Sequence, residues 1–338
     1  MRILLLAAGS MVLASMMDLN MVYGDESLIW DPKGLVGDDA LEVLWEEGGF
    51  TEGAAAGPDG SMYFSDFAQP FNARPARIMK YDPASGNTTI HCADSKMGNG
   101  LMFTREGRLL ACCASPLGGA RALVEITPDG MVNPIHERID GKRFNSPNDL
   151  VIARDGTVFF TDPKYVGPEE LELDGFFVYK MTTNGEVSIA TTEIDKPNGI
   201  VLSPDQRSIY IAETDNGSAK ADIEEGFKPG RMTLNVFKLK DGELSKRKVL
   251  YDFGEQTGVD GMTVDKDGRI YAAVRSADDF GLWVFNSKGK VLAKIKTPSL
   301  PTNCSFGKGD ESQRLYITAG GGFYRIQMNT IGYHPAID

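Results

Sequence analysis

The sequence contains few of the residues on which several common kinds of chemistry depend. Only three of its 338 residues are histidine, and its four cysteines form neither a C-x-x-C pair nor a spacing typical of zinc sites. It also lacks a G-x-S-x-G segment, so a Ser–His–Asp hydrolase has no visible parts. Because Cys92, Cys112, Cys113 and Cys304 lie in strand-like surroundings, we expect buried free thiols rather than a disulfide framework.

Positive charge and long apolar runs are also scarce. The sequence contains 35 lysines and arginines but 47 aspartates and glutamates, which gives a net charge of −12. A nucleic-acid partner is therefore not expected, because phosphate binding needs a basic footprint. The apolar run Ile3–Ala14 is too short to cross a bilayer, and no later stretch is long enough.

That short run follows Arg2 and precedes small residues, which is the pattern of a secretory signal. We predict that residues 1–24 are this signal, with the cleavage site left open between Ala14 and Gly24. The mature protein is then a secreted or periplasmic domain formed by residues 25–338, without a membrane anchor. The sequence does not predict its oligomeric state.

Glycine and proline are plentiful, at 38 and 17 residues, and predict many turns and short strands. One pattern, a turn followed by a short strand, recurs six times. If the third position after each turn is taken as a marker, the markers are Tyr63, Leu110, Phe159, Tyr210, Tyr271 and Tyr316. Their spacings of 47, 49, 51, 61 and 45 residues indicate six repeated units.

Most units contain a second hairpin after the first, which makes four strands per unit. Four-stranded repeats of this length are typical of the blades of a β-propeller. A β-sandwich is the alternative, but it does not explain six turns in phase. We therefore predict an all-β fold with a single six-bladed propeller of four antiparallel strands per blade. The last unit ends after its third strand, and the segment Leu41–Trp45 is expected to supply the fourth and to cover the open edge.

Oxygen-bearing side chains occupy the same phase in each unit, eleven or twelve residues before the marker. In blade order they are Glu52, Asn99, Asn148, Asn198, Asp260 and the zone Thr302-Asn303-Cys304. This position opens the innermost strand, where the blades converge on the axis. Carboxylates buried there must be paired or bind a metal. Oxygen donors of this kind suit Ca²⁺, while Mn²⁺, Mg²⁺ or Zn²⁺ would fit less well. The alternative is that the asparagines only bond strand backbones or cap turns.

Five segments in this order resemble the gluconolactonase/regucalcin-like (senescence-marker-like) family of six-bladed β-propellers. The resemblance covers residues 41–327 and rests on Glu52-Gly53, Ser146-Pro147-Asn148-Asp149-Leu150, Lys196-Pro197-Asn198-Gly199-Ile200, Val259-Asp260-Gly261-Met262 and Pro301-Thr302-Asn303. It implies that Glu52, Asn148, Asn198 and Asp260 hold one divalent cation, usually calcium. It also implies hydrolysis of a sugar lactone. Because the family is similar to organophosphate-hydrolysing and paraoxonase-type propellers, a phosphotriesterase or aryl-ester hydrolase stays open. A non-catalytic propeller that keeps calcium for rigidity stays open as well.

Asp260 is the first candidate for the general base, since a carboxylate at the metal can also bond water. Asp149 is the alternative base. Asn99, Asn148 and Thr302 are candidates for binding substrate hydroxyls.

The chain departs from the simplest family pattern by two insertions, Pro168–Asp174 and Thr214–Arg231. Both follow the second strand of their blade, so we expect them on the face where the polar positions open. They either shape the substrate mouth or are solvated loops.

Overall fold

The turns found in the sequence join the two innermost strands of each blade. In the first blade, β3 (Phe50–Ala56) and β4 (Met62–Phe67) are antiparallel partners. Gly60, in the turn between them, has a φ of 82°, a conformation that glycine adopts without steric cost. The computed structural model describes residues 28–217 and 229–338. The predicted signal at residues 1–24 lies outside this range.

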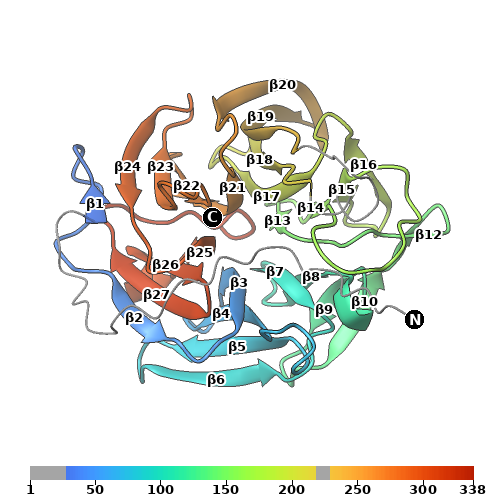
Figure 1. Cartoon of the computed structure of the whole chain (residues 1–338), viewed down its shortest axis with the longest axis horizontal. Coiled ribbons are helices and arrows are strands. Elements are labelled where there is room, and N and C mark those ends of the chain that lie inside the picture. The colour runs from blue at the N-terminus through green and yellow to red at the C-terminus, as the bar shows by residue number, and fades with distance from the viewer. Residues whose placement is uncertain (1–27, 218–228) are drawn as a thin grey trace, which may run out of the picture.

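Six sheets surround one axis, with β3, β7, β13, β17, β21 and β25 innermost (Figure 1). The first blade adds β5 (Arg77–Asp82) and β6 (Asn87–Cys92) to β3 and β4. The second blade consists of β7 (Gly98–Phe103), β8 (Leu109–Cys113), β9 (Ala122–Ile126) and β10 (Val132–His136). The third consists of β13 (Leu150–Ile152), β14 (Val158–Asp162), β15 (Phe177–Met181) and β16 (Val187–Thr191). The fourth blade consists of β17 (Pro197–Leu202), β18 (Ser208–Thr214), β19 (Met232–Lys240) and β20 (Glu243–Asp252). The fifth consists of β21 (Val259–Val264), β22 (Ile270–Val274), β23 (Gly281–Phe285) and β24 (Val291–Ile295). The sixth contains β25 (Pro301–Phe306), β26 (Arg314–Ala319) and β27 (Gly322–Gln327). A small ribbon, β11 (Arg138–Ile139) with β12 (Lys142–Arg143), lies between the second and third blades in the chain. The predicted propeller is confirmed.

The N-terminal segment closes the ring. β2 (Glu42–Trp45) pairs with β27 and completes the sixth blade, as predicted. β1 (Ile29–Trp30) pairs with β24 and adds a fifth strand to the fifth blade, which the sequence did not predict. One segment thus covers the outer edges of two neighbouring blades, where unpaired backbone groups would otherwise be exposed.

Aromatic side chains that follow the turns fill the space between blades. Phe64 of the first blade stacks on Phe323 of the sixth, with ring centroids 4.2 Å apart, and Tyr316 stacks on Phe323 at 5.6 Å. All three side chains are fully buried. The four cysteines are buried and free, in agreement with the expectation from the sequence.

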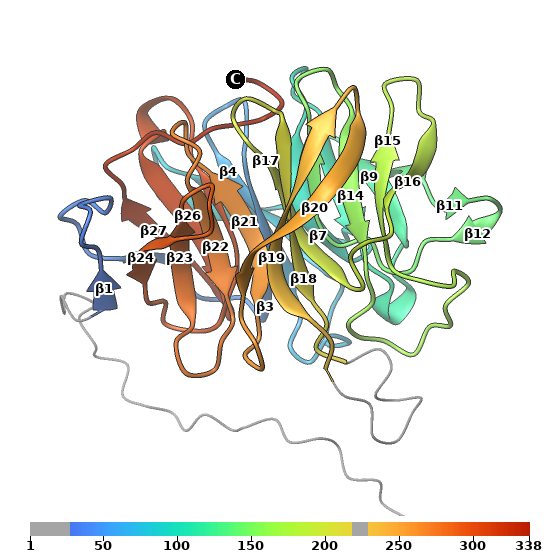
Figure 2. The same cartoon turned by 90° about the horizontal axis from the view of Figure 1, so that it is seen from above.

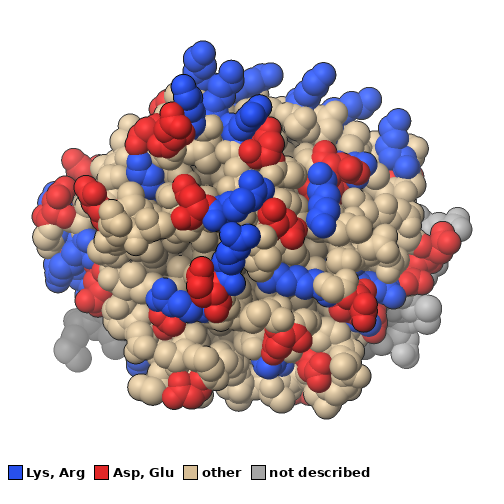
Figure 3. Space-filling model, turned by 180° about the vertical axis from the view of Figure 1, so that it is seen from behind, with Lys and Arg blue, Asp and Glu red and all other residues tan. Residues whose placement is uncertain are grey.

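The outer surface carries charges of both signs. Figure 3, seen from the side opposite to Figure 1, shows acidic and basic side chains interspersed, with lysines and arginines gathered along the upper edge. In Figure 1 that edge is formed by β19 and β20, which carry Lys238, Lys240, Lys246 and Lys248. Among the described residues, no helix has the length and hydropathy needed to span a bilayer.

The C-terminal tail crosses the axis at the end opposite to the polar positions. It packs against the last residues of the innermost strands: the Tyr333 N–H donates to the Val264 carbonyl at 3.1 Å, and a His334 ring nitrogen lies 3.0 Å from the Gly307 carbonyl. Arg154 and Gln206 donate to the Tyr333 hydroxyl at 3.1 and 2.9 Å. The tail thus lies over the hub (Figure 1), at one edge of the disc in side view (Figure 2).

We expect His334→Gln to make the protein less sensitive to acid. Burial lowers the pKa of His334 to about 4, below the unperturbed value of about 6.5. Between these values the unfolded chain binds a proton that the folded chain does not, so stability is lost as the pH falls through this window. A glutamine side chain at this position could still donate to the Gly307 carbonyl but does not titrate.

Urea unfolding at pH 7 and pH 4.5 tests this prediction. The wild type should lose about 1–3 kcal/mol more than the variant between the two values. Tyr333→Phe is the matched control, because it weakens the same tail without removing a titrating group in this range. Equal losses in the wild type and His334→Gln would contradict the prediction.

Candidate functional site

A β-bulge lies at the predicted polar position of the innermost strands. The pairing shifts register between Glu52 and Ala54 in the first blade, and between Val259 and Met262 in the fifth. The second, fourth and sixth blades have the same irregularity. In the third blade, β13 begins just after the position, and the Asn148 N–H still donates to the Thr161 carbonyl at 2.9 Å. Bulges re-aim side chains and are common beside active sites, so the backbone itself sets the direction of the side chains at these positions.

The residue after each polar position controls how closely the inner strands approach. It is glycine in four blades: Gly53, Gly100, Gly199 and Gly261. A Cβ on Gly199 would lie 2.3 Å from the Asp260 carbonyl oxygen, and one on Gly53, whose φ is +32°, would lie 2.1 Å from that of Asn99. The glycines therefore allow backbone-to-backbone contact around the hub.

Gly199→Ala is expected to disturb this contact. The new Cβ would meet the Asp260 backbone, which cannot rotate away, so we expect a loss of about 1–3 kcal/mol in the free energy of unfolding. A weaker affinity for a divalent cation should accompany it, because Asn198 and Asp260 are both displaced. Gly258→Ala is the control for a milder contact, since its Cβ would lie 3.2 Å from a ring carbon of Phe253, a side chain that can shift slightly. Chemical denaturation and a calcium titration measure both effects, and wild-type values for Gly199→Ala would refute the packing argument.

Asp149 and Asn303 occupy the same register as these glycines in the third and sixth blades. Each side chain accepts a hydrogen bond from the next backbone N–H, at 2.9 and 2.8 Å. Each also lies against the glycine of a neighbouring blade, where a Cβ on Gly100 or Gly261 would collide with it. Both line a small cavity on the axis beneath the ring, which the C-terminal tail closes from the other side.

Three buried carboxyl groups influence one another at the hub. Burial and the charges of Asp260 and Asp149 raise the pKa of Glu52 well above its usual value, and its Oε2 accepts a hydrogen bond from the Gly53 N–H at 2.9 Å. Burial also raises the pKa of Asp260, against the opposing effect of Arg275, and raises that of Asp149 to about 7. Closely placed acidic groups like these are each stabilised in the charged form by a cation.

Asn198 carries a buried acceptor atom that such a cation could bind. Its side chain hydrogen-bonds to Asp260, while its Oδ1 is buried and has no hydrogen-bond partner within the described residues. A buried acceptor without a partner is rare in a folded protein. Asn148 is partly exposed, and Asn99 is buried with its carbonyl accepting from the Ser65 hydroxyl at 2.6 Å.

Thr302 has the predicted register but a different environment. It is completely buried, and its hydroxyl lies 2.8 Å from the Thr51 carbonyl and 2.7 Å from the Thr318 hydroxyl. The Thr302 hydroxyl thus links the sixth blade to the first through the Thr51 carbonyl and does not lie at the hub. Asn303, from the same zone, contributes the polar side chain of this blade.

Two residues at the hub had no counterpart in the sequence prediction. Arg275 follows β22, and its Nη1 lies 3.3 Å from Asp260 Oδ2. Tyr165 comes from the loop after β14; its hydroxyl donates to the Thr214 carbonyl at 3.2 Å. Burial, followed by the charge of Asp260, raises the pKa of Tyr165 well above its usual value. Both residues come just after the second strand of a blade, which is the only sequence signal they share.

The insertion Pro168–Asp174 reaches across to the second blade. Glu169 accepts hydrogen bonds from the Leu117 N–H at 3.0 Å and the Ser115 hydroxyl at 3.4 Å. It therefore forms part of the face on which the ring opens, as expected. In the insertion Thr214–Arg231, the charged run Asp222–Glu225 lies outside the described residues. The ends of that insertion meet where the Gly230 N–H donates to the Asp215 carbonyl at 2.8 Å.

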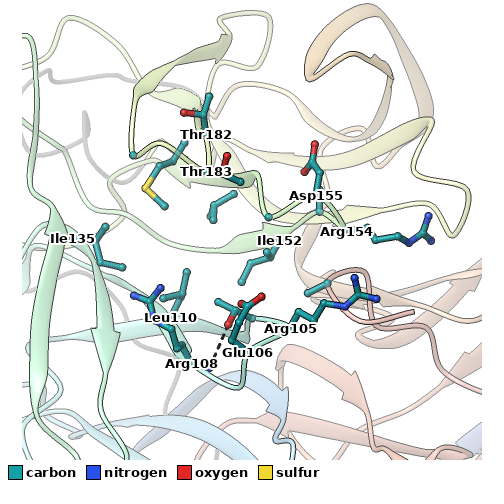
Figure 4. A pocket seen from close by; sticks show the side chains of 17 residues that line it. Arg105, Glu106, Arg108, Leu110, Ile135, Ile152, Arg154, Asp155, Thr182 and Thr183 are labelled. Carbon is teal, nitrogen blue, oxygen red and sulfur yellow. Dashed lines mark hydrogen bonds between the residues drawn. The ribbon is translucent and has the colours of Figure 1, made fainter.

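A cavity of about 470 Å³ lies at the opposite end of the second and third blades (Figure 4). Its floor is apolar, with Leu110, Ile135 and Ile152, and charged side chains such as Arg105 and Asp155 surround it. No residue of the ring lines it. Nor do three His, Cys, Asp or Glu side chains of the described residues group together as a metal cluster. The candidate site is thus defined by two carboxylates with carboxamides, a donor set that matches a hard cation rather than zinc.

The fold is a six-bladed propeller, and the carboxyl groups of Glu52 and Asp260 lie close to each other at its hub with the side chain of Asn198. Residues 50–321 match the model of the SMP-30/gluconolactonase/LRE-like region. The chain belongs to this family.

Individual relatives agree with this assignment. The chain is 28% identical to a gluconolactonase from Zymomonas mobilis over 86% of this chain and 82% of that protein. It is 26% identical to a pentonolactonase from Haloferax volcanii over 73% of this chain and 75% of that protein. Among solved structures, a gluconolactonase from Xanthomonas campestris superposes with a TM-score of 0.74 and 28% identity, covering 87% of this chain and 91% of that one.

Proposed function

We propose that the protein is a lactone hydrolase that opens a sugar lactone at the hub with the help of one divalent cation. The observation that carries the proposal is the buried, unpartnered Oδ1 of Asn198 beside Asp260 and Glu52. The lactone as substrate is supported by the relatives, whose names include gluconolactonase and pentonolactonase.

The residues present fit a cation held by Glu52, Asn148, Asn198 and Asp260. Two carboxylates balance a double positive charge, and the carboxamide oxygens complete the donor set. Oxygen ligands alone favour calcium, which accepts six to eight of them, over Mn²⁺, Mg²⁺ or Zn²⁺. When bound, such a cation polarises the lactone carbonyl and stabilises the negative charge that develops on its oxygen.

We assign Asp260 as the general base that takes a proton from the attacking water. Its carboxylate is oriented by Asn198 and by the guanidinium of Arg275. Water adds its oxygen to the acyl carbon, the acyl–oxygen bond of the ring breaks, and the released alkoxide takes up a proton. Near neutral pH the net reaction is lactone plus water giving a hydroxy-carboxylate and one proton.

Asp149 is the alternative base. It follows Asn148 in the chain and is buried. Its carboxylate accepts hydrogen bonds from the Leu150 N–H and, at 3.4 Å, from the Ile200 N–H. These bonds and its position against Gly100 support a role in orienting the inner strands. Asn99 and Asn148 are the candidates for substrate hydroxyls, whereas the hydroxyl of Thr302 is already engaged.

A proton-release assay on a panel of aldonolactones tests the proposal. It is run with calcium, manganese, magnesium or zinc and with a chelator, beside an aryl ester and a phosphotriester. We expect calcium-dependent acid release from at least one aldonolactone. Release only from the aryl ester or the phosphotriester would transfer the function to those substrates. Flat traces throughout would indicate a non-catalytic propeller.

A further inference from the structure

The guanidinium of Arg275 lies at the hub with only part of its hydrogen-bonding capacity used. Both polar contacts of the guanidinium come from Nη1, which lies 3.3 Å from Asp260 Oδ2 and donates to the Pro301 carbonyl at 3.0 Å. Within the described residues, Nε and Nη2 donate no hydrogen bond. The side chain is 21% exposed, and neither nitrogen is among the buried polar atoms that lack a partner in the described residues, so both can reach solvent.

The surrounding residues hold this guanidinium in place. The Arg275 N–H donates to the Gly258 carbonyl at 3.0 Å, which fixes the backbone at the end of β22. The guanidinium carbon lies 5.9 Å from the centre of the Phe50 ring, close enough for a cation–π contact. The charge of Arg275 affects the pKa values of Glu52, Asp260 and Tyr165. The group is therefore a fixed cation among the residues of the proposed site.

Two other cations in the described part of this face already have partners. Lys196 is buried, with its Nζ 4.5 Å from the centre of the Tyr165 ring and bonded to Asn216 Oδ1 at 3.0 Å. Arg74 is paired with Asp66, 2.5 Å away. Arg275 differs because the carboxylate beside it, Asp260, is also a proposed cation ligand. It contacts that carboxylate through one nitrogen only, whereas a guanidinium can bind a carboxylate through two.

We propose that Arg275 receives the carboxylate that forms when the lactone opens. The inference rests on the proposed function and adds a product-binding residue to the same site. The uncharged lactone makes no strong demand on a guanidinium. Hydrolysis turns its acyl carbon into a carboxylate close to Asp260, and the unused donors of Arg275 can bind that group. Arg275 thus recognises hydroxy-carboxylates in preference to their neutral analogues.

The test compares D-gluconate with D-gluconamide, which has the same shape at the carboxyl end but no charge. Isothermal titration calorimetry with calcium present measures both ligands on the wild type, Arg275→Met and Arg275→Lys. We expect the wild type to prefer gluconate, and Arg275→Met to weaken gluconate about ten- to a hundredfold, as for other charged hydrogen bonds. Gluconamide should bind all three proteins alike, and Arg275→Lys should recover part of the affinity. Arg74→Met is the matched control and should behave as the wild type.

A calcium titration of the same variants separates anion binding from a structural role. Arg275→Met should bind calcium at least as tightly as the wild type, because a positive charge beside Asp260 has been removed. Weaker calcium binding, an equal loss of gluconate and gluconamide, or no wild-type preference for gluconate would each overturn the inference. If no lactone is hydrolysed but the loss specific to gluconate is seen, the proposed function fails while the anion site stands.

Discussion

Replacing Asp260 with asparagine is expected to lower kcat/KM for the lactone by about 10³-fold or more. Asparagine has nearly the same shape and can keep a hydrogen bond with Asn198, so the fold should be retained. It cannot accept a proton from water, and it removes one of the two negative charges that the cation needs. The measurement is initial-rate kinetics on the best aldonolactone, with circular dichroism and the melting temperature as checks on folding.

Two further variants make this result specific. Asp155→Asn changes an exposed carboxylate in a turn at the opposite end of the third blade, where it accepts the Thr157 N–H at 2.9 Å, and it should leave kcat/KM unchanged. Asp149→Asn tests the alternative base. Full activity in Asp260→Asn together with an inactive, folded Asp149→Asn would transfer the role to Asp149.

The pH profile distinguishes the two carboxylates further. Burial raises the pKa of Asp149 to about 7, so it becomes ionised only as the pH rises through neutrality. A bound cation would lower this pKa, so if Asp149 is the base, the rate with calcium bound climbs at or below pH 7, and this rise disappears in Asp149→Asn. If Asp260 is the base, the profile of Asp149→Asn keeps the shape of the wild-type profile.

The sequence was sufficient to predict the fold because turn chemistry recurs in phase. Each Asp-Gly or related turn fixes where one strand ends and the next begins, so six turns establish six blades. The closing strand at Leu41–Trp45 followed from the missing strand of the last blade. β1 did not, since the two residues Ile29–Trp30 show no alternation that distinguishes a strand from a loop.

The phase of the repeat also predicted which residues lie at the start of the innermost strands, but not where each side chain points or what it contacts. Thr302 shows the difference: its register is right, yet its short side chain meets the Thr51 carbonyl before it reaches the axis. Arg275 and Tyr165 lie in connections that follow second strands. These connections differ in length from blade to blade, so counting from a turn cannot identify them. Their place follows only from the packing of neighbouring blades.

Removal of divalent cations is expected to reduce turnover to the uncatalysed rate while the propeller stays folded. The blades are held by buried aromatic and aliphatic side chains and by the closing strands β1 and β2, none of which depends on the hub. Loss of the cation leaves the charges of Glu52 and Asp260 to be offset by Arg275. Dialysis against a chelator, followed by lactone kinetics and circular dichroism, measures both effects, and added calcium should restore the rate.

Binding of the cation at the hub should also be measurable as a gain in protein stability and as a calcium affinity that depends on pH. Calcium at a hundred times its Kd should raise the free energy of unfolding by about 2.7 kcal/mol. Glu52→Gln, which removes one charged ligand at nearly constant shape, should lose most of that gain, whereas Asp155→Asn should keep it. Because burial and neighbouring charges raise the pKa of Glu52, a proton competes with the cation for this carboxylate, and calcium affinity should increase with pH. Full turnover in the chelated protein would refute the role of the cation.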